Sequence, residues 1–178
     1  DINVSADANC QFTVGDYIAL ASATDNCDNN VDLVQVPAPG TVVAGTTLVA
    51  ITATDDAGNF STCTFELIVV DTNNPTITTC APDDIILVDA NCEVALPNYT
   101  SLIVASDNCD ANLTLNQVPA PGSNFSGHGT VVTVTITATD DSGNSDSCSF
   151  DITLVDDIDP AISCQNALNQ TADAGNCN

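Results

Sequence analysis

The sequence predicts an all-β protein built from tandem β-sandwiches of about 83 residues each, because strand-type patterning occurs together with an internal repeat. Residues 130–138, TVVTVTITA, alternate β-branched residues at a period of two and show no helical stripe. Six or seven short strands in about 83 residues is typical of a small β-sandwich.

The strands follow one another with turn residues between them. Residues 130–138 lead into the acidic turn at 140–144 and then into renewed alternation over 148–155, which predicts a hairpin with an acidic tip. The first repeat predicts the same hairpin, with strands at 46–53 and 63–70 around a turn at 55–59. Shorter strands are expected at 84–88, 93–96 and 113–118.

The internal repeat defines the expected domains. At an offset of 82, three motifs recur: residues 7–10 at 89–92, residues 25–28 at 107–110, and residues 35–40 at 117–122. Residues 51–56 recur at 136–141 with an offset of 85, so three residues enter within 123–129, a segment that contains His128 and is expected to be a lengthened loop. Pro160–Cys164 and Asp173–Cys177 begin a third copy. We therefore expect a first repeat at 1–72 that lacks its first strand, a second at 73–157, and the start of a third at 158–178.

The charge of the chain excludes several classes of function. The sequence has 22 Asp, 2 Glu and no Lys or Arg, so its formal net charge is −24. Without cationic side chains it cannot neutralise phosphates, and we expect no nucleic-acid partner and no binding to anionic membranes. No apolar run of 18 residues is present, so no membrane insertion is expected either. Cations are the expected partners of this surface.

Nine cysteines in 178 residues favour disulfides and an extracellular or cell-surface location. No CxxC pair occurs, and a single His cannot complete a zinc shell. We expect a mature or internal segment of an exported protein, because no signal peptide is evident. Two pairing schemes fit the count. One joins Cys27 to Cys63, Cys109 to Cys148, Cys80 to Cys92 and Cys164 to Cys177; the other joins Cys10 to Cys27, Cys63 to Cys80, Cys92 to Cys109 and Cys148 to Cys164.

Five motifs in order give the second repeat a family resemblance: Pro75–Cys80, Asp89–Cys92, Ser106–Cys109, Ala138–Asn144 and Cys148–Phe150. This series resembles a bacterial hyalin repeat (HYR) domain, and the resemblance covers essentially the whole chain. It implies immunoglobulin-like sandwiches in tandem, extracellular adhesion or a structural fibre, and no catalytic activity. It also supports the first pairing scheme. The lack of Lys and Arg departs from the family and leaves open how adjacent domains are held together.

Acidic loops suggest a structural calcium site. Ca²⁺ takes six to eight oxygen ligands, and carboxylate and amide oxygens gather in loops that we expect to meet at one end of each sandwich. The alternatives are solvated turns screened by salt, because Asp and Asn are ordinary turn formers, and a halophilic surface. The candidate ligands are Asp71, Asn73, Asp107, Asp110, Asp140 and Asp141, with Asp25, Asp28, Asp55 and Asp56 in the first repeat; Asp156, Asp157 and Asp159 form the next junction.

No catalytic site is expected, and the chain is not expected to be an enzyme. Paired carboxylates such as Asp55 and Asp56 have no nucleophile or base beside them in the motif, and His128 lies in a segment that the other repeat lacks. Glycosylation is possible at exposed Thr and at the sequons of Asn3, Asn59, Asn98, Asn112, Asn124 and Asn169.

The sequence therefore predicts a segment of an extracellular filament or cell-surface stalk, a disulfide-stapled rod stiffened by calcium. The alternatives are an adhesin that presents a ligand-binding or cell-binding face, and spacer modules of a larger secreted enzyme. The expected partners are further copies of the same repeat, in the same chain or as a homopolymer, and glycans. Exchange of strands between subunits is also open, since residues 168–178 duplicate residues 1–11 in role.

Overall fold

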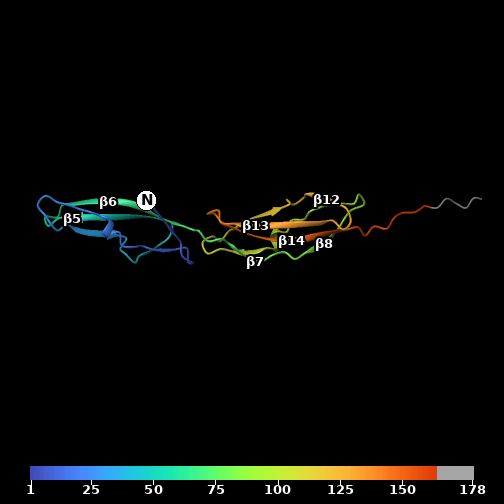
Figure 1. Cartoon of the computed structure of the whole chain (residues 1–178), viewed down its shortest axis with the longest axis horizontal. Coiled ribbons are helices and arrows are strands. Elements are labelled where there is room, and N and C mark those ends of the chain that lie inside the picture. The colour runs from blue at the N-terminus through green and yellow to red at the C-terminus, as the bar shows by residue number, and fades with distance from the viewer. Residues whose placement is uncertain (164–178) are drawn as a thin grey trace, which may run out of the picture.

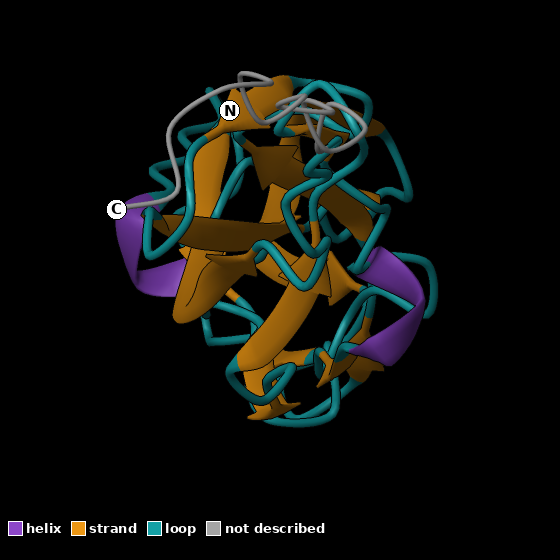
Figure 2. Ribbon diagram, turned by 90° about the vertical axis from the view of Figure 1, so that its right-hand side faces the viewer, coloured by secondary structure: helices purple, strands orange, loops and turns teal. Residues whose placement is uncertain are grey.

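The structure, a computed structural model, describes residues 1–163 and consists almost entirely of β-strands. Two short 3₁₀ helices, η1 (Ile18–Leu20) and η2 (Thr100–Leu102), lie at the periphery in the end-on view of Figure 2. The strands of the first half are β1 (Ile2–Ser5), β2 (Phe12–Thr13), β3 (Asp32–Val36), β4 (Val42–Val43), β5 (Thr46–Thr54) and β6 (Phe60–Val70). Those of the second half are β7 (Thr76–Thr79), β8 (Asp84–Leu87), β9 (Glu93–Ala95), β10 (Val104–Ser106), β11 (Thr114–Val118), β12 (Asn124–Ser126), β13 (Val131–Thr139) and β14 (Ser145–Val155).

The two halves have the same main sheet. In the first half the strand order is β1-β6-β5-β3, and in the second it is β8-β14-β13-β11. Each sheet has one parallel pair at its edge, β1 with β6 or β8 with β14, and is otherwise antiparallel. Within residues 1–163 every strand pair joins strands of the same half, and Figure 1 draws the halves end to end.

Short strand pairs face these sheets and complete the sandwiches. β2 pairs with β4 in the first half, and β9 pairs with β12 in the second. The second half also has β7 paired with β10. In the first half, residues 22–24 correspond to β10, and no strand among the described residues pairs with them. This missing pair is the main difference between the halves.

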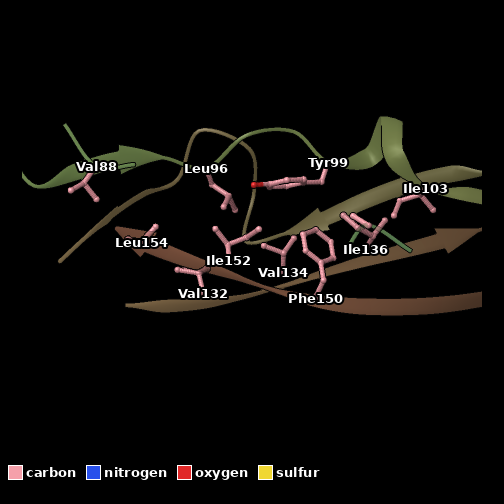
Figure 3. Packing of buried hydrophobic residues seen from close by; sticks show 11 residues of the cluster. Val88, Leu96, Tyr99, Ile103, Val132, Val134, Ile136, Phe150, Ile152 and Leu154 are labelled. Atoms are coloured by element: carbon pink, nitrogen blue, oxygen red, sulfur yellow. The ribbon is translucent and has the colours of Figure 1, made fainter. Parts of the chain in front are cut away.

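The core of the second half comes from the alternation that predicted its strands. Val132, Val134 and Ile136 of β13 are buried, whereas the threonines between them lie on the outer face. Figure 3 shows Tyr99 and Ile103 on the opposite side of the core from the β13–β14 hairpin. Tyr99 packs edge-on against Phe150 of β14, with ring centroids 5.1 Å apart. The apolar side chains of the two layers therefore pack against one another, as in a β-sandwich.

The first half has a smaller core with the same central contact. Val14, Val49 and Leu67 are its fully buried cluster, and Tyr17 packs edge-on against Phe65 at 5.2 Å. Ala138 is fully buried in the second half, but its counterpart Ala53 is only partly buried. The lost burial lies on the side where the second half places β7.

The predicted all-β class, with disulfide-bonded β-sandwiches, is confirmed, and the predicted strands match β5, β6, β8, β9, β11, β13 and β14 to within a few residues. One detail is wrong: residues 123–129 are not simply a longer loop. Asn124–Ser126 form β12, which pairs with β9 through Phe125 and Val94. β12 is the counterpart of β4 at the offset of 82, so the inserted residues lengthen the turn between β12 and β13, and the pattern NFS is too short to predict the strand.

The disulfides differ from both predicted schemes. Cys80 bonds Cys148 within the second half, and Cys10 bonds Cys109 across the two halves. The predicted bonds Cys109–Cys148, Cys80–Cys92 and Cys27–Cys63 are wrong, and so are all four bonds of the alternative scheme. The reason is geometric: β7 lies beside β14, which brings Cys80 to Cys148, and the turn at Cys10 meets the loop of Cys109 in the other half, a contact that neither scheme contains. The expected Cys164–Cys177 bond lies outside the described residues.

Candidate functional site at the junction of the two halves

The junction is formed by four segments from both halves. The turn Asp7–Gln11 and the linker after β6 come from the first half, while the loop Asp107–Asp110 and the tip of the β13–β14 hairpin come from the second. A covalent bond and a hydrogen bond cross between them: Cys10 is bonded to Cys109, and Asn108 Nδ2 donates to the carbonyl of Asp7 at 3.2 Å.

The turn at Asp7 presents Cys10 toward the second half. Asp7 Oδ1 accepts hydrogen bonds from the backbone N–H groups of Asn9 at 2.8 Å and Gln11 at 3.0 Å. Cys10 adopts a φ of 60°, the left-handed region that non-glycine residues rarely enter. The same turn recurs at Asp89, where Cys92 has a φ of 61°. The motif Asp-Ala-Asn-Cys therefore specifies a rigid turn with a cysteine at its tip.

The loop Asp107–Asp110 is held by its own carboxylates. Asp107 Oδ1 accepts from the backbone N–H groups of Cys109 at 2.8 Å and Asp110 at 3.0 Å. Asp110 Oδ2 accepts from the backbone N–H of Asp141 at 2.9 Å, which ties this loop to the hairpin tip. The equivalent bond in the first half joins Asp28 Oδ2 to Asp56 N at 3.1 Å. Equivalent hydrogen bonds therefore tie this loop to the hairpin tip in both halves.

The hairpin tip reaches the linker through Asn144. Asp140 is only 6% exposed and accepts from Asn144 N at 2.7 Å and Asn144 Nδ2 at 2.8 Å. Asn144 Nδ2 also donates to the carbonyl of Asp71 at 3.3 Å. Desolvation raises the pKa of Asp140, but hydrogen bonds from Asn144, Gly143 and Ser142 outweigh it and hold that pKa below its ordinary value.

Three candidate ligand side chains meet at the junction. Ligand atoms of Asp71, Asp107 and Cys109 lie within 4.8 Å of one another, and each residue is half-buried. Asp107 Oδ2 is buried and has no hydrogen-bond partner. Cys109 is bonded to Cys10, so its sulfur is not a thiolate ligand. The carboxylates of Asp71 and Asp107 are therefore the two groups of this set that offer oxygen atoms as ligands.

The other candidate ligands lie around this pair or apart from it. Asp110, Asp140 and Asp141 are in the neighbouring loops, and Asn73 donates its backbone N–H to Asp71 Oδ1 at 3.0 Å. Within residues 1–163, Asp25, Asp28, Asp55 and Asp56 belong to no such group of three. A hydrogen bond from the Asn59 side chain lowers the pKa of Asp55, which is the counterpart of Asp140. These four residues close loops at the outer end of the first half.

Two positions that matter for the structure were missed from the sequence. Gln117 is 4% exposed; its Oε1 accepts from Tyr99 N at 2.8 Å and its Nε2 donates to the carbonyl of Pro97 at 2.9 Å. Gln35 makes the same bonds with Tyr17 N at 2.7 Å and Gly15 O at 2.9 Å. The available signal was the repeated hexapeptide that begins with each glutamine.

Several predicted sites lie on the surface. Asn3, Asn59, Asn98, Asn112 and Asn124 are exposed, whereas Asn169 lies outside the described residues. Asn59 Nδ2 is engaged with Asp55 Oδ2 at 2.7 Å. His128 is exposed, and its Nδ1 accepts from the backbone N–H of Asp156 at 3.1 Å. Within residues 1–163, no helix is long and apolar enough to cross a membrane.

These features define a class of protein: disulfide-bonded β-sandwiches with an acidic, covalently linked junction. Residues 70–154 match the family model described as HYR domain. A relative from Mus musculus, named "Sushi, von Willebrand factor type A, EGF and pentraxin domain-containing protein 1", is 33% identical over 141 residues. A second, named "Hyalin", from Lytechinus variegatus, is 33% identical over 155 residues. These relatives are animal proteins, so they give no support to the expected bacterial source.

The two relatives are much longer than this chain. The matches cover 76% and 83% of the chain but 4% of the mouse protein and 28% of hyalin. The chain thus resembles a part of each relative. Disulfides persist outside the reducing cytosol, and together with these relatives they assign the chain to the extracellular space or the cell surface. The HYR match supports a module of the adhesion type.

Solved structures give distant similarities. The protocadherin GammaB4 extracellular domain is 14% identical with a TM-score of 0.42, and the match covers 86% of this chain and 31% of that one. The fibronectin(III)-like modules of Clostridium thermocellum CbhA are 11% identical with a TM-score of 0.36, and the match covers 92% and 94% of the two chains. The fold described above rests on strand pairing and core packing instead.

Proposed function

We propose that this chain is a structural segment of an extracellular filament or cell-surface stalk, in which β-sandwich repeats are joined end to end into a rod. The observation that carries the proposal is the Cys10–Cys109 disulfide, which fixes one half to the other across the junction. A short linker alone permits bending, whereas a linker and a disulfide give two separate attachments between the same two bodies. Two attachments restrict rotation about the long axis, which is the property that a stalk needs.

The repeats of this rod are residues 1–72, 73–157 and a third that begins at 158. This division follows the internal repeat, and it agrees with strand pairs that stay within 2–70 and 76–155. Under this proposal the first half has the same HYR-type fold as residues 70–154, because its main sheet has the same strand order. Further copies of the repeat are then the natural partners at either end.

We propose calcium as the cation at the junction. The carboxylates of Asp71 and Asp107 fit this ion, since the buried Asp107 Oδ2 has no partner within the protein and both groups carry negative charge. Ca²⁺ needs six to eight oxygens, which backbone carbonyls, Asp110 and water would complete. Bound calcium would supply positive charge between two facing carboxylates in a chain that has no Lys or Arg. The role of the residues is to hold the linker against the loop Asp107–Asp110.

The test is thermal unfolding of the 178-residue chain, with disulfides intact, in calcium and in excess EGTA at matched ionic strength. Calcium at 100 times its dissociation constant should stabilise the fold by about 2.7 kcal/mol, and magnesium should not reproduce the shift. Asp107→Asn should remove the shift, because it keeps the Oδ1 acceptor but loses the charge. Asp25→Asn, the same change in the first half, should keep it. An equal shift in both variants, or no shift in the parent chain, would reject calcium at this junction.

Glycans are a further proposed partner of the rod. Asn3, Asn98, Asn112 and Asn124 are exposed sequon positions on both halves. A glycan at these sites would shield a surface that carries a single sign of charge. Mass spectrometry of the chain from its native host would measure their occupancy.

A further inference from the structure

The first half contains a groove where the second half contains a strand. This groove encloses about 490 Å³ and lies between the segment at 21–25 and the strands β5 and β6. Its lining includes Ala23, Thr24, Ser61 and Cys63. At the repeat offsets of 82 and 85 these residues correspond to Ala105, Ser106, Asp146 and Cys148.

In the second half, the residues at those four positions pair with β7, accept a hydrogen bond from it or bond the cysteine at its end. Ala105 pairs with Ile77 and Ser106 pairs with Thr76. Asp146 Oδ2 accepts from Ile77 N at 3.0 Å, and Cys148 is bonded to Cys80 at the end of β7. The groove of the first half therefore occupies the place that β7 fills in the second half.

The chain contains a second copy of the sequence that forms β7. Pro160-Ala-Ile-Ser-Cys164 repeats Pro75-Thr-Ile-Thr-Thr-Cys80 with one residue fewer. β7 has a bulge at this place, because its pairing steps from Thr79 to Ile77 while β10 advances by one residue. In an extended strand of this sequence, which lacks the extra residue, positions 162 and 164 would fall on the same face. Ile162 is 88% exposed, whereas Ile77 packs against the core.

Among the described residues, the cysteines that form no disulfide also have counterparts in the other half. Each of the three corresponds to a bonded cysteine of the other half: Cys27 to Cys109, Cys63 to Cys148, and Cys92 to Cys10. Cys27 and Cys63 lie at the outer end of the first half, near the β5–β6 hairpin tip, since Asp28 bonds Asp56. Cys92 lies at the opposite end, where Val88 N bonds the carbonyl of Val155. These cysteines therefore lie at opposite ends of the described part of the chain.

We propose that the groove of the first half receives residues Pro160–Cys164 of a second copy of this chain, so that copies join head to tail. The inserted strand places Cys164 of the donor beside Cys63 of the acceptor, as Cys80 lies beside Cys148. The same docking places Cys92 of the donor beside Cys27 of the acceptor, as Cys10 lies beside Cys109. This inference rests on the proposed function and specifies the partner and the links of the rod.

Both links form by thiol–disulfide exchange with a small-molecule disulfide. A thiolate of one copy attacks this oxidant and releases one small thiol, giving a mixed disulfide on the protein. The cysteine of the other copy then attacks the mixed disulfide and releases the second small thiol. Each protein disulfide therefore forms by loss of two protons and two electrons from two cysteines, and the oxidant is reduced to two thiols.

The experiment is oxidation of the 178-residue chain in a glutathione redox buffer, followed by non-reducing electrophoresis and peptide mapping. Trypsin has no site in a chain without Lys or Arg, so a protease that cuts at Asp is required. We expect a ladder of oligomers and two linked peptide pairs, Cys27–Cys92 and Cys63–Cys164. Failure to form oligomers, or Cys63–Cys63 and Cys27–Cys27 links in their place, would overturn the proposal.

Matched variants separate strand docking from unspecific thiol oxidation. Ile162→Asp should abolish the ladder, since it puts a charge on the face that enters the groove, whereas Ile158→Asp, outside the strand, should leave it intact. Cys27→Ser and Cys92→Ser should each fail to form a Cys27–Cys92 link alone and should form one when mixed. Equal ladders from both Ile variants would overturn the proposal. Calcium-dependent melting of the monomer would in that case still support the proposed function, so the two failures are distinguishable.

Discussion

At the scale of single residues, a buried glutamine in each half connects the loop before the 3₁₀ helix to the main sheet. Gln117 bonds the backbone of Tyr99, Pro97 and Pro119, and Gln35 makes equivalent contacts in the first half. The loop would otherwise leave backbone N–H and C=O groups buried without partners. The amide side chain suits this place because it donates and accepts at once.

Replacing Gln117 should therefore destabilise the second half strongly. Gln117→Leu leaves at least Tyr99 N–H and the Pro97 carbonyl unpaired, at about 1–3 kcal/mol for each group, so we expect a loss of about 2–6 kcal/mol. Urea denaturation measures the change. Gln11→Leu at an exposed position should stay within about 0.5 kcal/mol of the parent. Equal losses in the two variants would contradict the bonding role of Gln117.

The acidic turns should make stability depend on pH in a defined direction. Backbone hydrogen bonds from Glu93 and Asn91 lower the pKa of Asp89 below its ordinary value of 3.8. The folded-state pKa lies below the unfolded-state value, so this stabilisation is present above pH 3.8 and is lost as the pH falls through the folded-state pKa.

Asp89→Ala should therefore lower the melting temperature at pH 7, and the difference from the parent should shrink as the pH falls below 3.8. Asp157→Ala removes the same charge from an exposed position that accepts no hydrogen bond within residues 1–163, and should cause a smaller loss at pH 7. A difference for Asp89→Ala that stays constant down to pH 2 would argue against the hydrogen-bonded carboxylate.

At the scale of elements, the long strands could be predicted because their signal is local. Alternation in β5, β6, β13 and β14 follows directly from one buried face and one exposed face. β12 could not be predicted, since three residues carry no periodicity and its pairing with β9 depends on distant residues. The prediction of cysteine pairing failed for the same reason. The repeat showed which cysteines are equivalent, but not which elements meet in space.

The disulfide between β7 and β14 should contribute substantially to the second half. Cys80 and Cys148 are separated by 68 residues, and a bond of this kind typically stabilises by about 2–4 kcal/mol. We expect the double change Cys80→Ser with Cys148→Ser to lower the free energy of unfolding by that amount in urea denaturation. Cys63→Ser, at the equivalent position without a bond, is the control and should have little effect. Unchanged stability of the double variant would show that β7 is held by packing alone.

At the scale of the whole molecule, the sequence predicted repeats and acidic loops but not how the repeats are joined. The sequence motifs place Asp71 and Asp107 in different segments, and the structure brings them together beside a disulfide between halves. The chain has no Lys or Arg, so ion pairs between side chains cannot hold adjacent repeats together. The disulfide holds the facing acidic loops together instead, because it is a covalent bond. Calcium at the same place would act on the same junction.

Small-angle X-ray scattering of the monomeric chain in calcium tests the end-to-end arrangement most directly. A compact protein of this length has a radius of gyration of roughly 16 Å. Two halves end to end, each about 37 Å long by the rise of an 11-residue strand, give about 21 Å. We expect the larger value and a distance distribution with a shoulder from the second half. A radius near 16 Å with a single symmetric peak would contradict a rod.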